Sequence, residues 1–138
     1  SCSLVGSEMC IRDRFMPEEN LDKFQAIADC AVFPSLYEPF GIVALESFAA
    51  RVPVVVSDTG GLPEVVENGI TGIVTKVGNP NSLALGILEV LKDYSFVQEL
   101  VNNAYQELKH KFSWGRIAKQ TDEIYQRVVV ERLEVVWS

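Results

Sequence analysis

The sequence has few of the residues on which metal, disulfide and membrane proteins depend. Its 138 residues include one histidine, His110, and three cysteines, Cys2, Cys10 and Cys30, whose spacing fits no zinc or disulfide pattern. No apolar run approaches the ~20 residues that a membrane helix needs, and no basic segment followed by an apolar one resembles a secretory signal. We therefore expect a reducing, cytoplasmic setting, with no metal site and no membrane span.

Positive charge is also scarce. Twelve Lys and Arg stand against 19 Asp and Glu, which gives a formal net charge of −7 and a pI of about 4.7. Surfaces that bind nucleic acid need clustered Lys and Arg, so we expect no nucleic-acid partner. The hydrophobic fraction of 48% and the charged fraction of 22% are those of an ordinary globular domain, and the length allows one such domain.

The first 14 residues differ from the rest of the chain. The segment SCSLVGSEMCIRDR, residues 1–14, has neither the period of a strand nor that of a helix. It closely resembles a translated sequencing-adapter sequence. We therefore expect residues 1–14 to be non-native, and they carry no functional argument.

From Phe15 onward, strands and helices are expected to alternate. The expected strands cover residues 30–35, 53–58 and part of 68–77. One helix is expected to start at Pro17. The others are expected at 42–50, in a short stretch after Gly61, at 80–93, at 95–111, and from about 113 to about 130 or beyond. The run PVVVSD is β-branched without alternation, as in a strand buried on both faces. We predict an α/β fold, with a partial Rossmann-like parallel sheet and flanking helices.

Two glycine-containing loops, 36–41 and 58–61, leave the expected strands at their carboxyl ends. Ligands of parallel sheets bind outside these ends, so both loops are predicted to lie on one rim. Gly41 stands where the first loop enters a helix. The amides of Ile42, Val43 and Ala44 are expected to lack intrahelical partners, and neither Phe40 nor Gly41 offers a capping side chain. The helix start is therefore expected to be open to a phosphate or diphosphate.

Two glutamates flank this helix start. The order of apolar residues in IVALESFAA places Glu46 on a core-facing stripe with Ile42, about one turn from the phosphate position. A partly buried carboxylate needs donors, which the hydroxyls of a ribose can supply, and Glu38 can accept hydroxyls of a hexose. Pairing of Glu46 with Arg51 or Lys23, and a solvated Glu38, remain open alternatives at this point.

The segment PSLYEPFGIVALESFAARVPVVVSDTGGLPEVVENGITGIV, with GNPNSLALGILEVLKD and FSWGRIAKQTDEIY after it, strongly resembles family 4 glycosyltransferases. These retaining enzymes, also called glycosyl transferases group 1, have the GT-B fold and include starch and glycogen synthases. The motif is specific: two glutamates around Pro-Phe-Gly, then Pro-Val-Val, then Gly-Gly-Leu-Pro-Glu. The resemblance covers roughly residues 15–130 and implies the C-terminal, donor-binding half of the fold.

The resemblance implies a role for each matching residue. Glu38 is implied as the catalytic residue, in contact with the donor hexose and close to the sugar transfer. The amides of Ile42 and Val43 are implied to hold the diphosphate, and Glu46 the ribose. The full set of implied donor-binding residues is Glu38, Phe40, Gly41, Ile42, Val43, Glu46, Gly60 and Gly61. The resemblance also implies a UDP- or ADP-sugar as co-substrate, no cofactor and no metal.

The sequence departs from the family pattern in two respects. The N-terminal acceptor domain and the opening strands of the donor domain are missing, so residues 15–138 are expected to be a truncated nucleotide-sugar-binding domain that is inactive alone. Arg51 stands where relatives usually have glycine, at a helix end that needs a positive φ, which costs roughly 1 kcal/mol for a non-glycine residue. A non-catalytic nucleotide-sugar-binding module, or an epimerase or phosphorylase on the same fold, remains an alternative to a hexosyltransferase.

Overall fold

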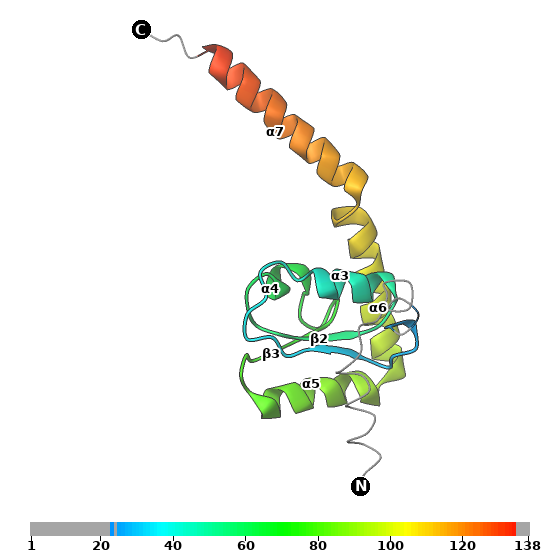
Figure 1. Cartoon of the computed structure of the whole chain (residues 1–138). Coiled ribbons are helices and arrows are strands. Elements are labelled where there is room, and N and C mark those ends of the chain that lie inside the picture. Colours follow the sequence, from blue (N-terminus) through cyan, green and yellow to red (C-terminus); the bar gives the residue numbers. More distant parts are fainter. Residues whose placement is uncertain (1–22, 24, 135–138) are drawn as a thin grey trace.

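The structure is a computed structural model that describes residue 23 and residues 25–134. The segment 1–14 and most of the helix expected from Pro17 lie outside the described residues. Figure 1 shows three layers, with a small sheet between helices, and one long helix that extends away from them.

The sheet has three parallel strands in the order β1 (Ala31–Phe33), β2 (Val54–Ser57) and β3 (Ile73–Thr75). Val32 lies opposite Val55 in the pairing of the first two strands. Because each strand is joined to the next by a helical crossover, all three carboxyl ends lie at one edge of the sheet. The predicted α/β class and the parallel sheet are confirmed.

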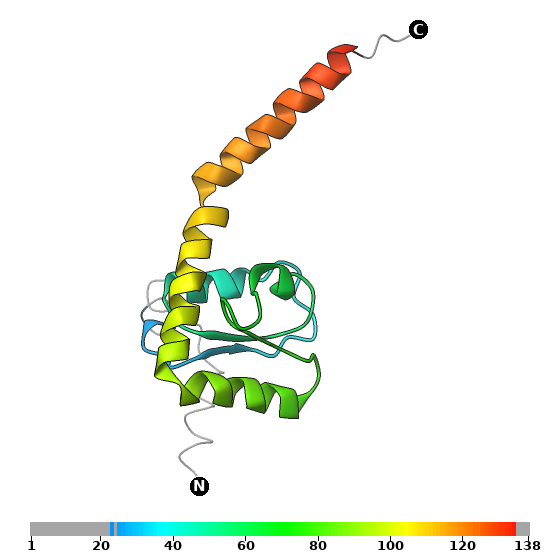
Figure 2. The same cartoon turned by 180° about the vertical axis from the view of Figure 1, so that it is seen from behind.

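Helices cover both faces of this sheet (Figures 1 and 2). Helix α3 (Ile42–Ala49) and the short helix α4 (Leu62–Val65) pack on one face, and α5 (Pro80–Lys92) packs on the other. Helix α6 (Tyr94–Lys111) contacts both α3 and α5, and so joins the two outer layers. Helix α7 (Trp114–Glu134) follows it. The expected helices after residue 41 are all present, and their bounds lie within two residues of those predicted, apart from the end of α7, which lies beyond residue 130 at Glu134.

The central strand β2 explains why both layers are needed. Its side chains Val54, Val55 and Val56 are all 0% exposed. Val54 and Val56 belong to the core cluster that includes Phe48 of α3, whereas Val55 belongs to the opposite cluster, which includes Leu100 of α6. A β-branched run without polar alternation therefore marks a strand that is covered on both faces, as predicted.

The turn after α3 has the backbone geometry that the sequence predicted. Arg51 has a φ of 58°, the left-handed region that normally favours glycine. Its guanidinium lies over the ring of Tyr105 in α6, 4.0 Å from the ring centroid, and the ammonium of Lys109 lies 4.6 Å from it. Interaction with Arg51 first, and with Lys109 second, lowers the pKa of Tyr105. The cation–π contact gives the Arg51 side chain a partner at this strained position.

Two side chains determine where the next helices begin. Asn79 accepts a hydrogen bond from the Ser82 amide at 3.0 Å and precedes Pro80, the first residue of α5, as predicted. Asp93 accepts from the amides of Ser95 and Phe96, and so caps α6.

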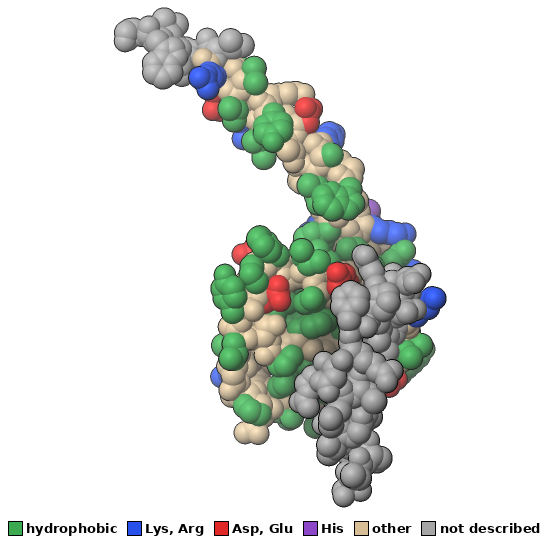
Figure 3. Space-filling model, in the orientation of Figure 1, with side chains coloured by type: hydrophobic (Ala, Val, Ile, Leu, Met, Phe, Trp, Pro, Cys, Tyr) green, Lys and Arg blue, Asp and Glu red, His purple; other side chains and the backbone are tan. Residues whose placement is uncertain are grey.

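Helix α7 makes almost no contact with the rest of the domain. From Trp114 to Arg132 every described side chain is exposed, and Trp114 is 83% exposed. Figures 1 and 3 show the helix projecting from the domain, with apolar side chains along it. Of the described helices, none combines the length and apolar composition required to cross a membrane.

Removal of α7 tests whether the domain core depends on it. A chain that ends at Ser113 is expected to melt within about 2–3 °C of the full chain, because the helix buries no described side chain and 1 kcal/mol corresponds to roughly 4–8 °C in a small domain. Scanning calorimetry measures this. Leu100→Ala is the positive control, since Leu100 is 1% exposed and its truncation costs roughly 2–5 kcal/mol. A comparable loss in the shortened chain would mean that α7 supports the core.

Candidate functional site

The two glycine-containing loops meet at the carboxyl edge of the sheet. Loop 36–41 follows β1 and loop 58–61 follows the neighbouring strand β2. The amide of Gly61 donates a hydrogen bond to the carbonyl oxygen of Glu38 at 2.9 Å, so the loops are in direct contact. The prediction that both loops lie on one rim is confirmed.

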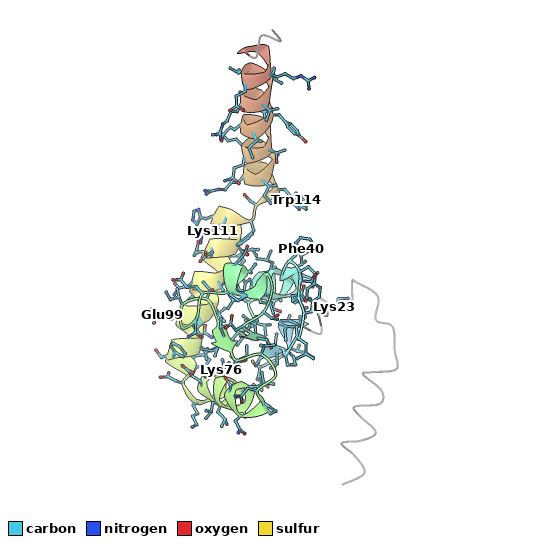
Figure 4. All side chains as sticks on the ribbon, turned by 90° about the vertical axis from the view of Figure 1, so that its left-hand side faces the viewer. Lys23, Phe40, Lys76, Glu99, Lys111 and Trp114 are labelled. Carbon is cyan, nitrogen blue, oxygen red and sulfur yellow. The ribbon has the colours of Figure 1, made fainter. Side chains whose placement is uncertain are left out.

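Glu38 is half-buried within loop 36–41. One of its carboxylate oxygens, Oε1, accepts a hydrogen bond from the amide of Gly41 at 3.3 Å. Phe40, which lies two residues after Glu38, is 73% exposed and lies beside the start of α3 (Figure 4). The carboxylate of Glu38 is therefore held against the helix start by its own loop and is not a freely solvated side chain.

The start of α3 is uncapped by any side chain. Gly41 is the N-cap residue, with a φ of 73° that glycine adopts without strain. No carbonyl among the described residues accepts from the amides of Ile42 and Val43. The Ala44 amide donates to the Gly41 carbonyl at 3.1 Å, so the expectation of three free amides is wrong for Ala44. Two backbone donors and the positive end of the helix dipole remain for an anion.

Glu46 does not lie on the buried stripe that the sequence analysis predicted. Its side chain is exposed, and Ile42 is 56% exposed, whereas the buried residues of α3 are Ala44, Ser47 and Phe48. The stripe was misassigned because nearly all of the helix is apolar, and because the buried Ser47 satisfies its hydroxyl by donating to the Val43 carbonyl at 3.0 Å.

The open position of Glu46 leaves its carboxylate available to solvent. Within the described part of the chain, no ion pair joins Glu46 to Arg51 or to Lys23. Figure 3 shows acidic side chains among apolar ones over α3 and α4, whereas Lys and Arg gather mainly along α6 and α7 in this view. The part of the rim over α3 and α4 is thus acidic in this view, and its attraction for an anion comes from backbone amides.

The glycines of the second loop differ in exposure. Gly60 is exposed and Gly61 is buried against loop 36–41, so Gly61 does not line an open crevice. Thr59 was not among the predicted site residues, and its hydroxyl donates to the Leu36 carbonyl at 3.2 Å. Thr59 lies directly after Asp58, at the carboxyl end of a buried strand, and this position in the sequence is the signal by which it could have been found.

A cavity of about 190 Å³ opens at the same edge of the sheet but on the side of α5. It is bordered by residues at or just after the carboxyl ends of the three strands and by the start of α5, namely Pro34, Ser57, Thr75, Lys76, Gly78, Asn79, Pro80 and Leu83. Neither Glu38 nor Glu46 lines it, so the cavity and the two glutamates are separate features of one rim.

Cys30 takes no part in the rim. It precedes β1 and so lies at the amino edge of the sheet, opposite the two loops. Burial, and secondarily the charge of Asp29, raises the pKa of the Cys30 thiol to about 11. The thiol is therefore protonated near neutral pH, which makes it a poor nucleophile.

Comparison with known proteins decides the family. The model of the family described as glycosyl transferases group 1 matches residues 7–107, which is most of the chain. The chain belongs to this family. The resemblance inferred from the motif around Glu38 and Glu46 is confirmed, and with it the membership of a glycosyltransferase fold.

Individual glycosyltransferases agree with this assignment. An uncharacterized glycosyltransferase of Methanocaldococcus jannaschii is 46% identical over 112 residues, which are 81% of this chain and 29% of that protein. A glycogen synthase of Mycobacterium tuberculosis is 44% identical over 98 residues, 71% of this chain and 24% of the synthase. The structure of Anabaena HepE in complex with UDP-glucose superimposes with a TM-score of 0.70 at 30% identity, over 75% of this chain and 29% of HepE. This chain thus spans less than a third of each of these glycosyltransferases.

The hydrogen bond between Glu38 and the Gly41 amide can be tested by amide hydrogen exchange. Gly41 is buried, so Glu38→Ala leaves its N–H without an acceptor, while Glu38→Gln keeps a side-chain oxygen. We expect exchange at Gly41 to accelerate about 5- to 10-fold in Glu38→Ala, in line with the roughly 1 kcal/mol of one hydrogen bond, and less in Glu38→Gln. Equal exchange rates in the two variants and the unmodified chain would contradict this assignment.

Proposed function

We propose that this chain forms most of the donor-binding half of a retaining glycosyltransferase, which transfers a glucose-like hexose from a UDP- or ADP-sugar to a saccharide or another hydroxyl acceptor. The observation that carries the proposal is the meeting, at one rim, of Glu38, the uncapped start of α3 and the exposed Glu46. The likeness to HepE, which was solved with UDP-glucose, supports a nucleotide-sugar donor.

Each part of the donor has a matching group on α3 or in the loop before it. The free amides of Ile42 and Val43, together with the helix dipole, suit the diphosphate. Glu46 lies about 6 Å further along the axis, at 1.5 Å per residue, where its exposed carboxylate accepts the hydroxyls of a ribose adjacent to that diphosphate. On the other side, Glu38 faces the hexose, where a carboxylate accepts sugar hydroxyls and acts on the reacting centre.

The proposal places the acceptor site in a part of the protein beyond this chain. Around Glu38 and Glu46 the described groups that can attract an anion are backbone amides, since Lys76 borders the separate cavity on the side of α5, so we expect the cations that neutralise the diphosphate to come from elsewhere in the protein. The expected N-terminal acceptor domain and the opening strands of the donor domain are the source that the family resemblance implies. We therefore expect the chain alone to lack transferase activity.

Kinetics of a longer protein that contains this chain test the two glutamates. Glu46→Gln is expected to raise the KM for the nucleotide sugar about 10- to 100-fold with little change in kcat, because hydrogen bonds to a charged group contribute roughly 1.5–3 kcal/mol. Glu38→Gln is expected to lower kcat about 100-fold or more, because it acts at the sugar that is transferred.

Glu89→Gln is the matched control for both variants. Glu89 is an exposed carboxylate on α5, on the opposite face of the sheet, so turnover should stay within about twofold. Normal kinetics in both Glu38→Gln and Glu46→Gln would overturn the site assignment. Product analysis in the same assay separates transfer from epimerisation or phosphorolysis, and binding of UDP-glucose without any turnover would indicate a non-catalytic module.

The proposed donor site needs no divalent cation. Because helix amides and the dipole hold the diphosphate, the transfer rate of the longer protein should change less than about twofold when EDTA is added or Mg²⁺ and Mn²⁺ are supplied. The measurement is the initial rate after dialysis against chelator. A loss of activity that Mg²⁺ or Mn²⁺ restores would contradict a metal-free site.

A further inference from the structure

We propose that Thr59, Gly60 and Gly61 are positioning residues, which place the Glu38 loop through backbone contacts rather than by holding the donor themselves. The proposal deepens the function proposed above and rests on it for the role of Glu38. The family resemblance implied that Gly60 and Gly61 bind the donor. In this proposal loop 58–61 positions Glu38 instead.

Two hydrogen bonds tie the later loop to the earlier one. The Gly61 amide donates to the Glu38 carbonyl at 2.9 Å, and the Thr59 hydroxyl donates to the Leu36 carbonyl at 3.2 Å. Both acceptors are backbone atoms of loop 36–41, one at the glutamate itself and one two residues before it. The path of the chain into Glu38 is therefore fixed from outside its own loop.

The glycines allow the two backbones to approach more closely than any other residues would. A Cβ placed on Gly60 would lie 1.9 Å from the Glu38 carbonyl oxygen, and a Cβ on Gly61 would lie 2.8 Å from the Pro39 carbonyl oxygen. Gly60 also has a φ of 53°. A side chain at either position requires the glutamate loop to move.

The position of the backbone at residue 38 determines the position of its carboxylate. The Glu38 carbonyl accepts a hydrogen bond from the Gly61 amide, and the Glu38 Oε1 atom accepts one from the Gly41 amide. The backbone carbonyl and the side-chain carboxylate of Glu38 therefore each have a defined partner. In an active site, a displacement of about 1 Å can cost on the order of 100-fold in rate. Loop 58–61 thus contributes to the reaction through the geometry of Glu38.

The decisive variant is Gly60→Ala, with Gly69→Ala as its matched control. Gly69 has a φ of 74°, and a Cβ there would meet nothing within 4 Å, so both variants carry backbone strain but only the first displaces Glu38. In the longer protein we expect kcat to fall about 100-fold in Gly60→Ala and to stay within about threefold in Gly69→Ala, with a smaller change in donor KM for both. An unchanged kcat in Gly60→Ala would overturn the proposal.

A gentler pair of variants covers the case in which Gly60→Ala does not fold. Thr59→Val removes the hydroxyl at nearly constant shape, and Thr59→Ser restores it. In Thr59→Val, NMR of the chain itself should show faster exchange of the Gly41 amide and a shifted Glu38 carboxyl carbon signal. In Thr59→Ser, the exchange rate and the signal should return to their values in the unmodified chain. Unmoved signals in Thr59→Val would overturn the positioning role.

The NMR readouts need no donor and no activity, so they separate this proposal from the proposed function. If the Glu38 and Gly41 signals move in this chain but the longer protein shows no sugar-transfer activity, the positioning role is supported and the transferase is contradicted. Transfer activity that depends on Glu38 but survives both Gly60→Ala and Thr59→Val would support the transferase and contradict positioning.

Discussion

Burial of β2 on both faces is the constraint on which the rest of this structure depends. A strand made of three fully buried valines needs apolar partners above and below, and α3 with α4 on one side and α5 on the other provide them. Because each helix must return the chain to a parallel strand, every strand reaches the same edge of the sheet with its carboxyl end. The packing of the core thereby creates the rim on which the candidate site lies.

At this rim, backbone groups provide most of the chemistry. The amides of Ile42 and Val43 have no acceptor among the described residues, the Gly61 amide donates to the carbonyl of Glu38, and the Gly41 amide donates to the Glu38 side chain. Side chains add two carboxylates of unlike exposure, Glu38 half-buried and Glu46 open to solvent. The difference suits unlike tasks, since a held carboxylate can act at a defined atom and an exposed one can receive a mobile ligand.

Much of this arrangement is predictable from the sequence because the signals are local. The β-branched run 53–58 indicated a buried strand, Asn79 and Pro80 indicated a helix start, and the expected left-handed turn at Arg51 is present. The buried face of α3 was predicted wrongly because an almost wholly apolar helix has no distinctive period, and tertiary packing selects the buried face.

The contacts between the two loops were not predictable in the same way. The bond from Thr59 to Leu36 joins residues 23 positions apart, and no spacing rule indicates which carbonyl a threonine will find. The close approach of Gly60 to Glu38 depends on the register of β1 against β2. The family motif indicated that these glycines matter, but only the structure assigns them a contact.

The order of the two loops along the chain has a consequence for folding. Loop 36–41 precedes loop 58–61 in the chain, and the hydrogen bond that joins them runs from the Gly61 amide to the Glu38 carbonyl, across 23 positions. The geometry of Glu38 therefore depends on a non-local contact, whose formation costs loop-closure entropy. A peptide that contains only the glutamate motif lacks loop 58–61, and so lacks the contact that fixes the backbone at Glu38.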